Sequence, residues 1–187
     1  MNREHLEFCA SDEWRDALVQ WIVPYALNGT GLGADALEVG PGPGLVTDIL
    51  RETVPHLTVV ELDESLADQL AARLAGTNVD VVQADATAMP FEDGRFSGAV
   101  SFTMLHHVPT AALQDRLFAE VGRVLAPGAR FVASDSLGSD DLAAFHDNDV
   151  YNPIDPSTLD GRLRAAGFAH VEVRQNEFGW AATASRP

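Results

Sequence analysis

The sequence of 187 residues is 46% hydrophobic and 21% charged, which indicates one globular domain with a sizeable core. Acidic residues outnumber basic ones by 28 to 12, so the net charge is −16, and every basic residue is an arginine. This charge argues against nucleic acid and anionic membranes as partners. The lack of lysine excludes a lysine-containing phosphate loop and Schiff-base chemistry.

The first predicted element is a helix over residues 11–27. Ser11 is suited to cap its start, and Pro24 is expected to kink or end it. The helical spacing comes from Trp14, Leu18, Trp21, Ile22 and Tyr25. The sequence Asn-Gly-Thr-Gly that follows predicts a break in the chain.

Repeated strand–helix units come next. Short apolar runs predict strands over 36–39, 57–62, 78–85, 96–102 and 129–135. Amphipathic stretches predict helices over 44–52 and 110–125, one through Leu66, Leu70 and Leu74, and one ending near Gly167. The runs 170–175 and 178–184 are close enough to form a hairpin.

These elements predict an α/β fold in one domain over residues 1–187. We expect a Rossmann-like doubly wound sheet, mostly parallel with an antiparallel C-terminal hairpin strand, and helices on both faces. Residues 1–30 are expected to form a helical cap, and residues 136–156 an insertion that could act as a lid.

The strongest motif is the turn after the first predicted strand, where Gly40, Gly42 and Gly44 alternate with prolines behind Glu38. Glycines let a backbone turn tightly and approach a ligand closely. The spacing is E-x-G-x-G-x-G and not the dinucleotide fingerprint, which would place a glycine at Leu45. The turn therefore favours a nucleotide-like ligand other than a dinucleotide.

With the motifs that follow it, this turn resembles the class I S-adenosylmethionine-dependent methyltransferases that act on small molecules. The resemblance covers residues 36–184 and includes Glu61 at the end of the second strand, residues 83–86, residues 90–102 and residues 123–128. It implies S-adenosylmethionine as cofactor and S-adenosylhomocysteine as product. The cofactor-binding residues that it implies are Glu38, Gly40, Pro41, Gly42, Gly44, Glu61, Leu62, Asp85, Ala86 and Phe102.

Within that resemblance, each cofactor contact has an expected role. Glu61 would accept both ribose hydroxyls, Leu62 would cover the adenine ring, and Asp85 and the Ala86 N–H would meet the adenine edge. The Phe102 carbonyl would face the cofactor's ammonium group. Asp63 is expected to cap the next helix instead of binding a ligand.

The acceptor would face the exit of the fourth strand. His106 and His107 are the candidate catalytic residues there, since imidazole can take a proton near neutral pH. The candidate substrate contacts are Trp14, Met104, His146 and Tyr151, whereas Trp21 is expected to pack in a helix. These aromatic residues favour a small, partly apolar acceptor.

No metal site is predicted, because adjacent histidines lack the i, i+4 spacing of a metal-binding pair and no cysteine cluster accompanies them. We expect a cytoplasmic protein that is a monomer or homodimer, since the single Cys9 suits a reducing compartment. Two alternatives remain open: an NAD(P)-dependent oxidoreductase, and a non-catalytic protein that binds S-adenosylmethionine.

Overall fold

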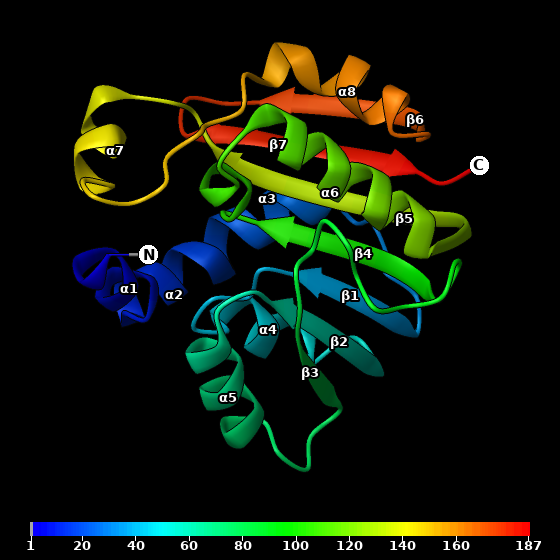
Figure 1. The fold of residues 1–187 in the computed structure, drawn as a ribbon, viewed down its shortest axis with the longest axis horizontal. Coiled ribbons are helices and arrows are strands. Elements are labelled where there is room, and N and C mark those ends of the chain that lie inside the picture. The colour runs from blue at the N-terminus through cyan, green and yellow to red at the C-terminus, as the bar shows by residue number, and fades with distance from the viewer. Residues whose placement is uncertain (1) are drawn as a thin grey trace.

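The computed structural model describes residues 2–187 and confirms the predicted α/β class (Figure 1). Seven strands form one sheet in the order β3-β2-β1-β4-β5-β7-β6. Their bounds are β1 Asp35–Val39, β2 His56–Glu61, β3 Val79–Gln83, β4 Phe96–Phe102, β5 Leu125–Ser136, β6 Ala169–Gln175 and β7 Gly179–Ser185. The first five strands pair in parallel, and β7 is antiparallel to both β5 and β6, as the predicted hairpin requires.

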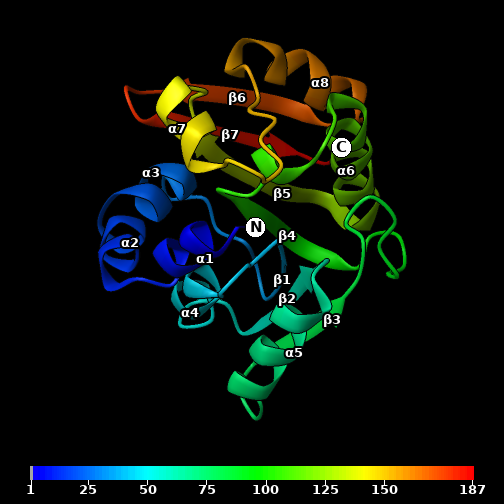
Figure 2. The same cartoon turned by 60° about the vertical axis from the view of Figure 1, so that its left-hand side comes forward.

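The helices cover both faces of this sheet (Figure 2). Their bounds are α1 Arg3–Cys9, α2 Asp12–Ala17, α3 Val23–Leu27, α4 Leu45–Leu50, α5 Glu64–Arg73, α6 Ala111–Val124, α7 Asp140–Phe145 and α8 Leu159–Ala165. One apolar core lies under α6 and α8, and a second one lies under α3, α4 and α5. No helix within residues 2–187 is both long and apolar enough to cross a membrane.

The predicted helix over 11–27 is continuous but differs from the expectation at Pro24. Ser11 caps it as expected, accepting a hydrogen bond from the Trp14 N–H. A π-helical turn, Leu18–Ile22, then widens the helix just before Pro24, which lies in the first turn of α3. A widened turn gives room for a residue without an N–H, so the helix continues to Leu27.

Two further differences concern the edges of elements. Within the expected helical cap of residues 1–30, the sequence predicts helix bounds only for 11–27, and the structure adds α1 before it with Asn2 as its N-cap. The fifth strand was expected to begin at residue 129, but β5 begins at Leu125, where α6 ends. Asp63 caps α5 as predicted, through the Leu66 N–H.

Candidate functional site

The candidate site lies where the parallel strands end. In the order β2-β1-β4 the chain reverses its direction of winding between β1 and β4, and open α/β sheets bind ligands outside such a point. In Figure 1, α1, α2 and α7 all stand at this edge, beside the arrowheads of β1, β4 and β5. The residues that follow these strand ends are therefore the ones that can meet a ligand.

The glycine turn joins β1 to α4. Its three glycines have φ values of +71°, +54° and +87°, a left-handed conformation that other residues rarely adopt. A Cβ atom at Gly40 would collide with the side chain of Met104, which follows β4. Gly40 therefore allows the turn to adopt a left-handed conformation and to pack directly against Met104, and a larger residue would prevent both.

Glu61 braces this turn from the end of the neighbouring strand β2. One of its carboxylate oxygens accepts a hydrogen bond from the Gly42 N–H at 3.1 Å, and the other accepts one from the Asp63 N–H at 3.0 Å. A carboxylate offers about four acceptor positions, so both oxygens can still accept a hydroxyl. Leu62 beside it is 66% exposed and can cover a flat ring.

Glu38 lies behind the turn and is almost completely buried. The Thr47 hydroxyl of α4 donates to its carboxylate at 2.7 Å. Burial raises the pKa of Glu38 from 4.5 to about 8, with a smaller opposing effect from the Thr47 hydrogen bond. At neutral pH this carboxyl is mostly protonated, so it joins β1 to α4 as a neutral group.

The remaining predicted cofactor residues lie at the same edge. Asp85 is exposed after β3, where its carboxylate accepts the Thr87 N–H at 2.8 Å, and Ala86 follows it. The Ala84 N–H donates to the Glu61 carbonyl at 2.9 Å, which holds this loop beside β2. Phe102 ends β4, is 5% exposed, and is followed by a left-handed Thr103 with a φ of +52°. A single ligand could therefore contact the ends of β1, β2, β3 and β4.

Four histidines form a cluster on the Met104 side of this edge. They are His5 of α1, His106 and His107 of the 3-10 turn Leu105–His107, and His146 after α7, and one ring nitrogen of each lies within 4.8 Å of the others. His5 was not singled out from the sequence. The ring centroids of His106 and His107 are 4.2 Å apart, and the His5 ring lies 4.9 Å from that of His107.

Hydrogen bonds fix the orientation of three of these rings. Nδ1 of His106 lies 2.7 Å from the Asp135 carboxylate, Nδ1 of His146 lies 2.6 Å from the Leu142 carbonyl, and Nδ1 of His107 lies 3.2 Å from the Val150 carbonyl. Carbonyl and carboxylate oxygens only accept, so in each neutral ring Nδ1 carries the proton and Nε2 carries a lone pair.

The environment disfavours a positive charge on three of the four rings, those of His5, His107 and His146. Burial, reinforced by the neighbouring histidines, lowers the pKa of His5 to about 4 and that of His107 to about 3. Burial also lowers the pKa of His146, against a smaller opposing effect of the Leu142 carbonyl. These imidazoles are therefore neutral at physiological pH.

The predicted substrate residues divide between the cluster and its surroundings. Tyr151 stacks on His146 with ring centroids 4.5 Å apart, and Met104 reaches the glycine turn. The ring centroid of Trp14 lies 5.3 Å from that of Phe8, and the Phe8 ring lies 5.8 Å from that of Phe145. Phe145 in turn contacts His5, so Trp14 reaches the cluster through these two phenylalanines. Trp21, which was expected to pack, is 71% exposed and faces neither core nor site.

The N-terminal helices and the segment after β5 hold each other in place. The Asn2 N–H donates to the Asp149 carboxylate at 2.9 Å, and the Asn2 amide donates to the Phe145 carbonyl at 3.0 Å. The Asn152 N–H donates to the His106 carbonyl at 2.7 Å. The start of the N-terminal segment is therefore joined to residues 145–149, and Asn152 is joined to the turn after β4.

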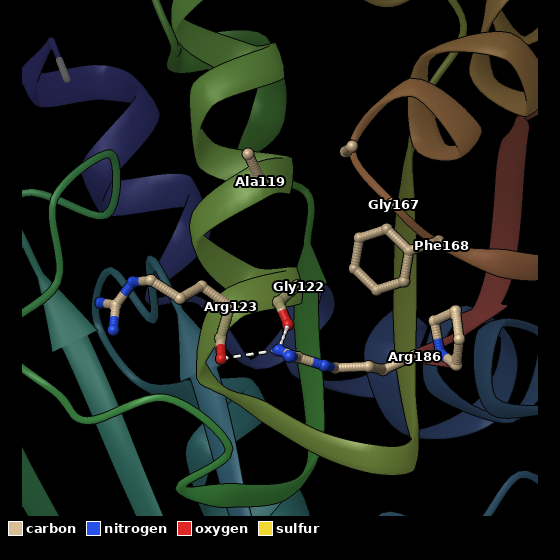
Figure 3. Close-up of a pocket in the computed structure, with 8 residues that line it drawn as sticks. Ala119, Gly122, Arg123, Gly167, Phe168 and Arg186 are labelled. Atoms are coloured by element: carbon tan, nitrogen blue, oxygen red, sulfur yellow. Dashed lines mark hydrogen bonds between the residues drawn. The ribbon is translucent and has the colours of Figure 1, made fainter.

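A separate hollow of about 450 Å³ lies near the start of β5, away from the glycine turn (Figure 3). It is lined by Gly122, Arg123, Phe168 and Arg186 among others, and the Arg186 guanidinium donates to the carbonyls of Gly122 and Arg123. No predicted site residue lines it, so the candidate site is the strand-end edge.

Comparison with known proteins agrees with the sheet and the turn. The sequence model of the methyltransferase domain family matches residues 37–133. The demethylmenaquinone methyltransferase of Clavibacter sepedonicus is 28% identical over 190 residues, which cover 86% of this chain and 74% of that protein. The ubiquinone/menaquinone biosynthesis C-methyltransferase UbiE of Brucella anthropi is 27% identical over 126 residues, which cover 64% of this chain and 45% of that protein.

A solved structure shows the same fold. The crystal structure of a SAM-dependent methyltransferase from Aquifex aeolicus superposes with a TM-score of 0.76 over 98% of both chains, at 16% sequence identity. The β1–β5 region and the edge that carries the glycine turn lie within this shared architecture.

Proposed function

The chain belongs to the methyltransferase domain family, and we propose that its acceptor is a small, partly apolar ring compound held beside Met104 and the histidine cluster. It is an S-adenosylmethionine-dependent methyltransferase with a small-molecule acceptor, and the oxidoreductase alternative is set aside. We propose the chemical class of the acceptor and the roles of the individual residues.

The observation that carries the cofactor assignment is the hydrogen bond from the Gly42 N–H to Glu61. It puts a glycine-rich turn next to a carboxylate that can accept two hydroxyls, and this combination fits a nucleoside joined to an amino acid. We assign the amino-acid end to Gly40–Gly44 and Phe102, and the ribose to Glu61. The adenine is assigned to Leu62, Asp85 and Ala86.

Methyl transfer needs little from the protein beyond position. When bound, S-adenosylmethionine supplies a methyl group already activated by its sulfonium. The chain's own residues then have to hold the acceptor in line and exclude water. We assign these tasks to Met104 and Tyr151 directly, to His146 through its stacking on Tyr151, and to Trp14 through the aromatic contacts that hold α1 in place.

The cap of residues 1–30 and the lid of residues 136–156 are part of this proposal, within a single domain. Residues 2–27 and 136–156 contact each other beside the strand ends, as a cover over an acceptor would. His106 and His107 lie beneath them, and their predicted role as proton acceptors stays a prediction. A cytoplasmic location and a monomeric or homodimeric state also stay predictions.

Two observations favour an aromatic ring as acceptor. Aromatic rings from α1, α2 and α7 gather in one contact chain of Trp14, Phe8 and Phe145, which leads to His5. The Clavibacter relative is named for demethylmenaquinone, a compound with an aromatic ring system. We therefore place hydroxylated naphthalene and benzene rings first among the candidate acceptors.

A turnover assay tests this function. Purified protein with S-adenosylmethionine is offered 1,4-dihydroxynaphthalenes, catechols and simple amines, and S-adenosylhomocysteine is measured by mass spectrometry. We expect turnover on at least one hydroxylated ring and none on the amines. Turnover on the amines alone would contradict the proposed acceptor. No turnover on any hydroxylated ring, combined with a melting temperature raised by S-adenosylhomocysteine, would favour the non-catalytic alternative.

A further inference from the structure

Three buried ring nitrogens in the histidine cluster have no hydrogen-bond partner among residues 2–187. They are Nδ1 of His5, Nε2 of His106 and Nε2 of His146. Leaving a buried polar atom unpaired is unfavourable, so three such atoms within one cluster require an explanation. His5 and His106 are each 5% exposed and His146 is 4% exposed, so bulk water does not supply one.

The tautomers of these rings restrict which partners the three unpaired nitrogens could have. Because Nδ1 of His106, His107 and His146 each lies beside an oxygen that can only accept, Nε2 is the nitrogen of each ring that is left to offer a lone pair to a ligand. Lone pairs on neighbouring rings cannot bond to one another. A species that accepts electron pairs from several imidazoles at once would satisfy all of them.

The surroundings supply the features that accompany protein metal sites. A histidine that binds a metal through one nitrogen almost always donates its other N–H to a carboxylate or carbonyl, which is the arrangement at His106, His107 and His146. The Asp135 and Asp149 carboxylates also lie close by, at 2.7 Å from His106 and 3.7 Å from His5. Two carboxylates beside four neutral ligands offset the charge of a divalent cation.

We propose that His5, His106, His107 and His146 bind one divalent transition-metal ion of the zinc class. Imidazole ligands suit Zn²⁺, Ni²⁺, Cu²⁺ and Fe²⁺, whereas Ca²⁺ and Mg²⁺ prefer oxygen ligands. Zn–N bonds of about 2.0–2.1 Å place tetrahedral nitrogens about 3.4 Å apart, so the 4.8 Å spread must contract by about 1.4 Å. The short helix α1 and the half-buried ring of His107 can provide this movement.

The proposed ion joins three segments that are far apart in the sequence. His5 lies on α1, His106 and His107 follow β4, and His146 follows α7. A tetrahedral site with four protein ligands leaves no open position, which is typical of structural metal sites and not of catalytic ones. The ion would therefore fix the cap and lid over the acceptor side, and the histidine nitrogens would serve the metal instead of accepting a proton. The proposed ion departs from the sequence-based prediction that the chain has no metal site, and the titration below decides between the two.

Metal binding can be tested without the methyl-transfer assay, so its failure is separate from failure of the proposed function. Untagged protein stripped with EDTA is titrated with Co²⁺, which gives strong visible absorption in tetrahedral sites, and then with competing Zn²⁺. We expect one equivalent of Co²⁺, displaced by Zn²⁺. Fewer than about 0.2 bound ions per protein chain for each of Co²⁺, Zn²⁺, Ni²⁺ and Cu²⁺ would overturn the proposal.

Variants locate the site. His146→Gln and His5→Gln should each weaken Co²⁺ binding at least tenfold. Asp135→Asn should weaken it by about 10- to 100-fold, since outer-shell partners of metal ligands have effects of this size. The matched control replaces the two histidines outside the cluster, His56→Gln with His170→Asn, and should leave binding within twofold. Binding lost in this control, or unchanged in both His5→Gln and His146→Gln, would contradict the assignment.

Folding of each variant is checked by circular dichroism. If His146→Gln does not fold, His5→Gln decides, because α1 lies outside the sheet and its loss should spare the β1–β5 core. Hydrogen exchange gives a second readout: Zn²⁺ should protect residues 3–9 and 140–145 in the parent protein. The same protection in His5→Gln would also contradict the proposal.

Discussion

The Glu61 carboxylate accepts a hydrogen bond from the backbone N–H of Gly42 at 3.1 Å, across the ends of two neighbouring parallel strands. The residue proposed to bind the ribose thus also holds the turn proposed to bind the amino-acid end. Ordering of the turn and binding of the cofactor are therefore coupled through one side chain.

Glu61→Ala should weaken S-adenosylhomocysteine binding by about 2–4 kcal/mol, because hydrogen bonds to a charged group contribute about 1.5–3 kcal/mol each. Isothermal titration calorimetry measures the change. Glu64→Ala is the matched control, since it removes the same charge from an exposed position three residues away and should leave affinity unchanged. Affinity of Glu61→Ala within threefold of the parent would place the ribose elsewhere.

Gly40→Ala should reduce S-adenosylhomocysteine affinity at least tenfold, because its Cβ would displace Met104 and force the turn to change. The left-handed backbone adds strain of about 1–2 kcal/mol. Gly76→Ala is the control, because Gly76 has a similar φ of +80° but nothing lies within 4 Å of an added Cβ. This variant therefore has the backbone strain without a steric collision. Equal affinities of the two variants for the ligand would show that the contact between Gly40 and Met104 is unimportant.

Glu38 should make the protein less stable as pH rises. Burial raises its pKa from the usual 4.5 to about 8 in the folded chain, so the folded state keeps a proton that the unfolded state loses. The free energy of unfolding should fall between pH 4.5 and 8, by at most about 1.4 kcal/mol per pH unit from this group, and level off above pH 8.

Urea denaturation across this pH range measures the effect as the difference between the parent and Glu38→Gln, which carries a permanently neutral side chain of the same shape. Glu64→Gln serves as an exposed control. A parent and a Glu38→Gln variant whose stabilities run parallel from pH 5 to 8 would mean that Glu38 is ionised in the folded chain.

Cofactor binding should protect the cap and the lid as well as the glycine turn. Hydrogen exchange with and without S-adenosylhomocysteine should show slower exchange in residues 40–44 and in at least one of 3–25 or 136–156, since these segments stand at the same edge of the sheet. Residues 169–175 of β6, at the far end of the sheet order, should not change. Protection restricted to residues 40–44 would leave the lid without support.

Much of the fold could be predicted because its signals are local. Buried parallel strands are continuous apolar runs, so β4 was predicted with its observed bounds, Phe96–Phe102. The glycine turn was predictable for the same reason, since three glycines in five residues require a special backbone. Glu61 followed from its place at the end of a buried strand.

The histidine cluster was missed because it is not local. His5 and His146 are separated by 141 positions, and no periodicity links them. A lone histidine in a short N-terminal helix carries no signal of its partners. Asp135 could have been found, because it is an acid at the carboxyl end of a predicted strand, the same signal that identified Glu61.

The place of β7 has a consequence for how this chain is made. β7 is the last strand in the described residues, yet it inserts between β5 and β6 and carries the fully buried Trp180. A ribosome adds about 5–20 residues per second, so β5 waits several seconds after its synthesis with one edge unpaired. During that interval a second nascent chain could pair with it, and efficient production should therefore depend on keeping such chains apart until β7 emerges.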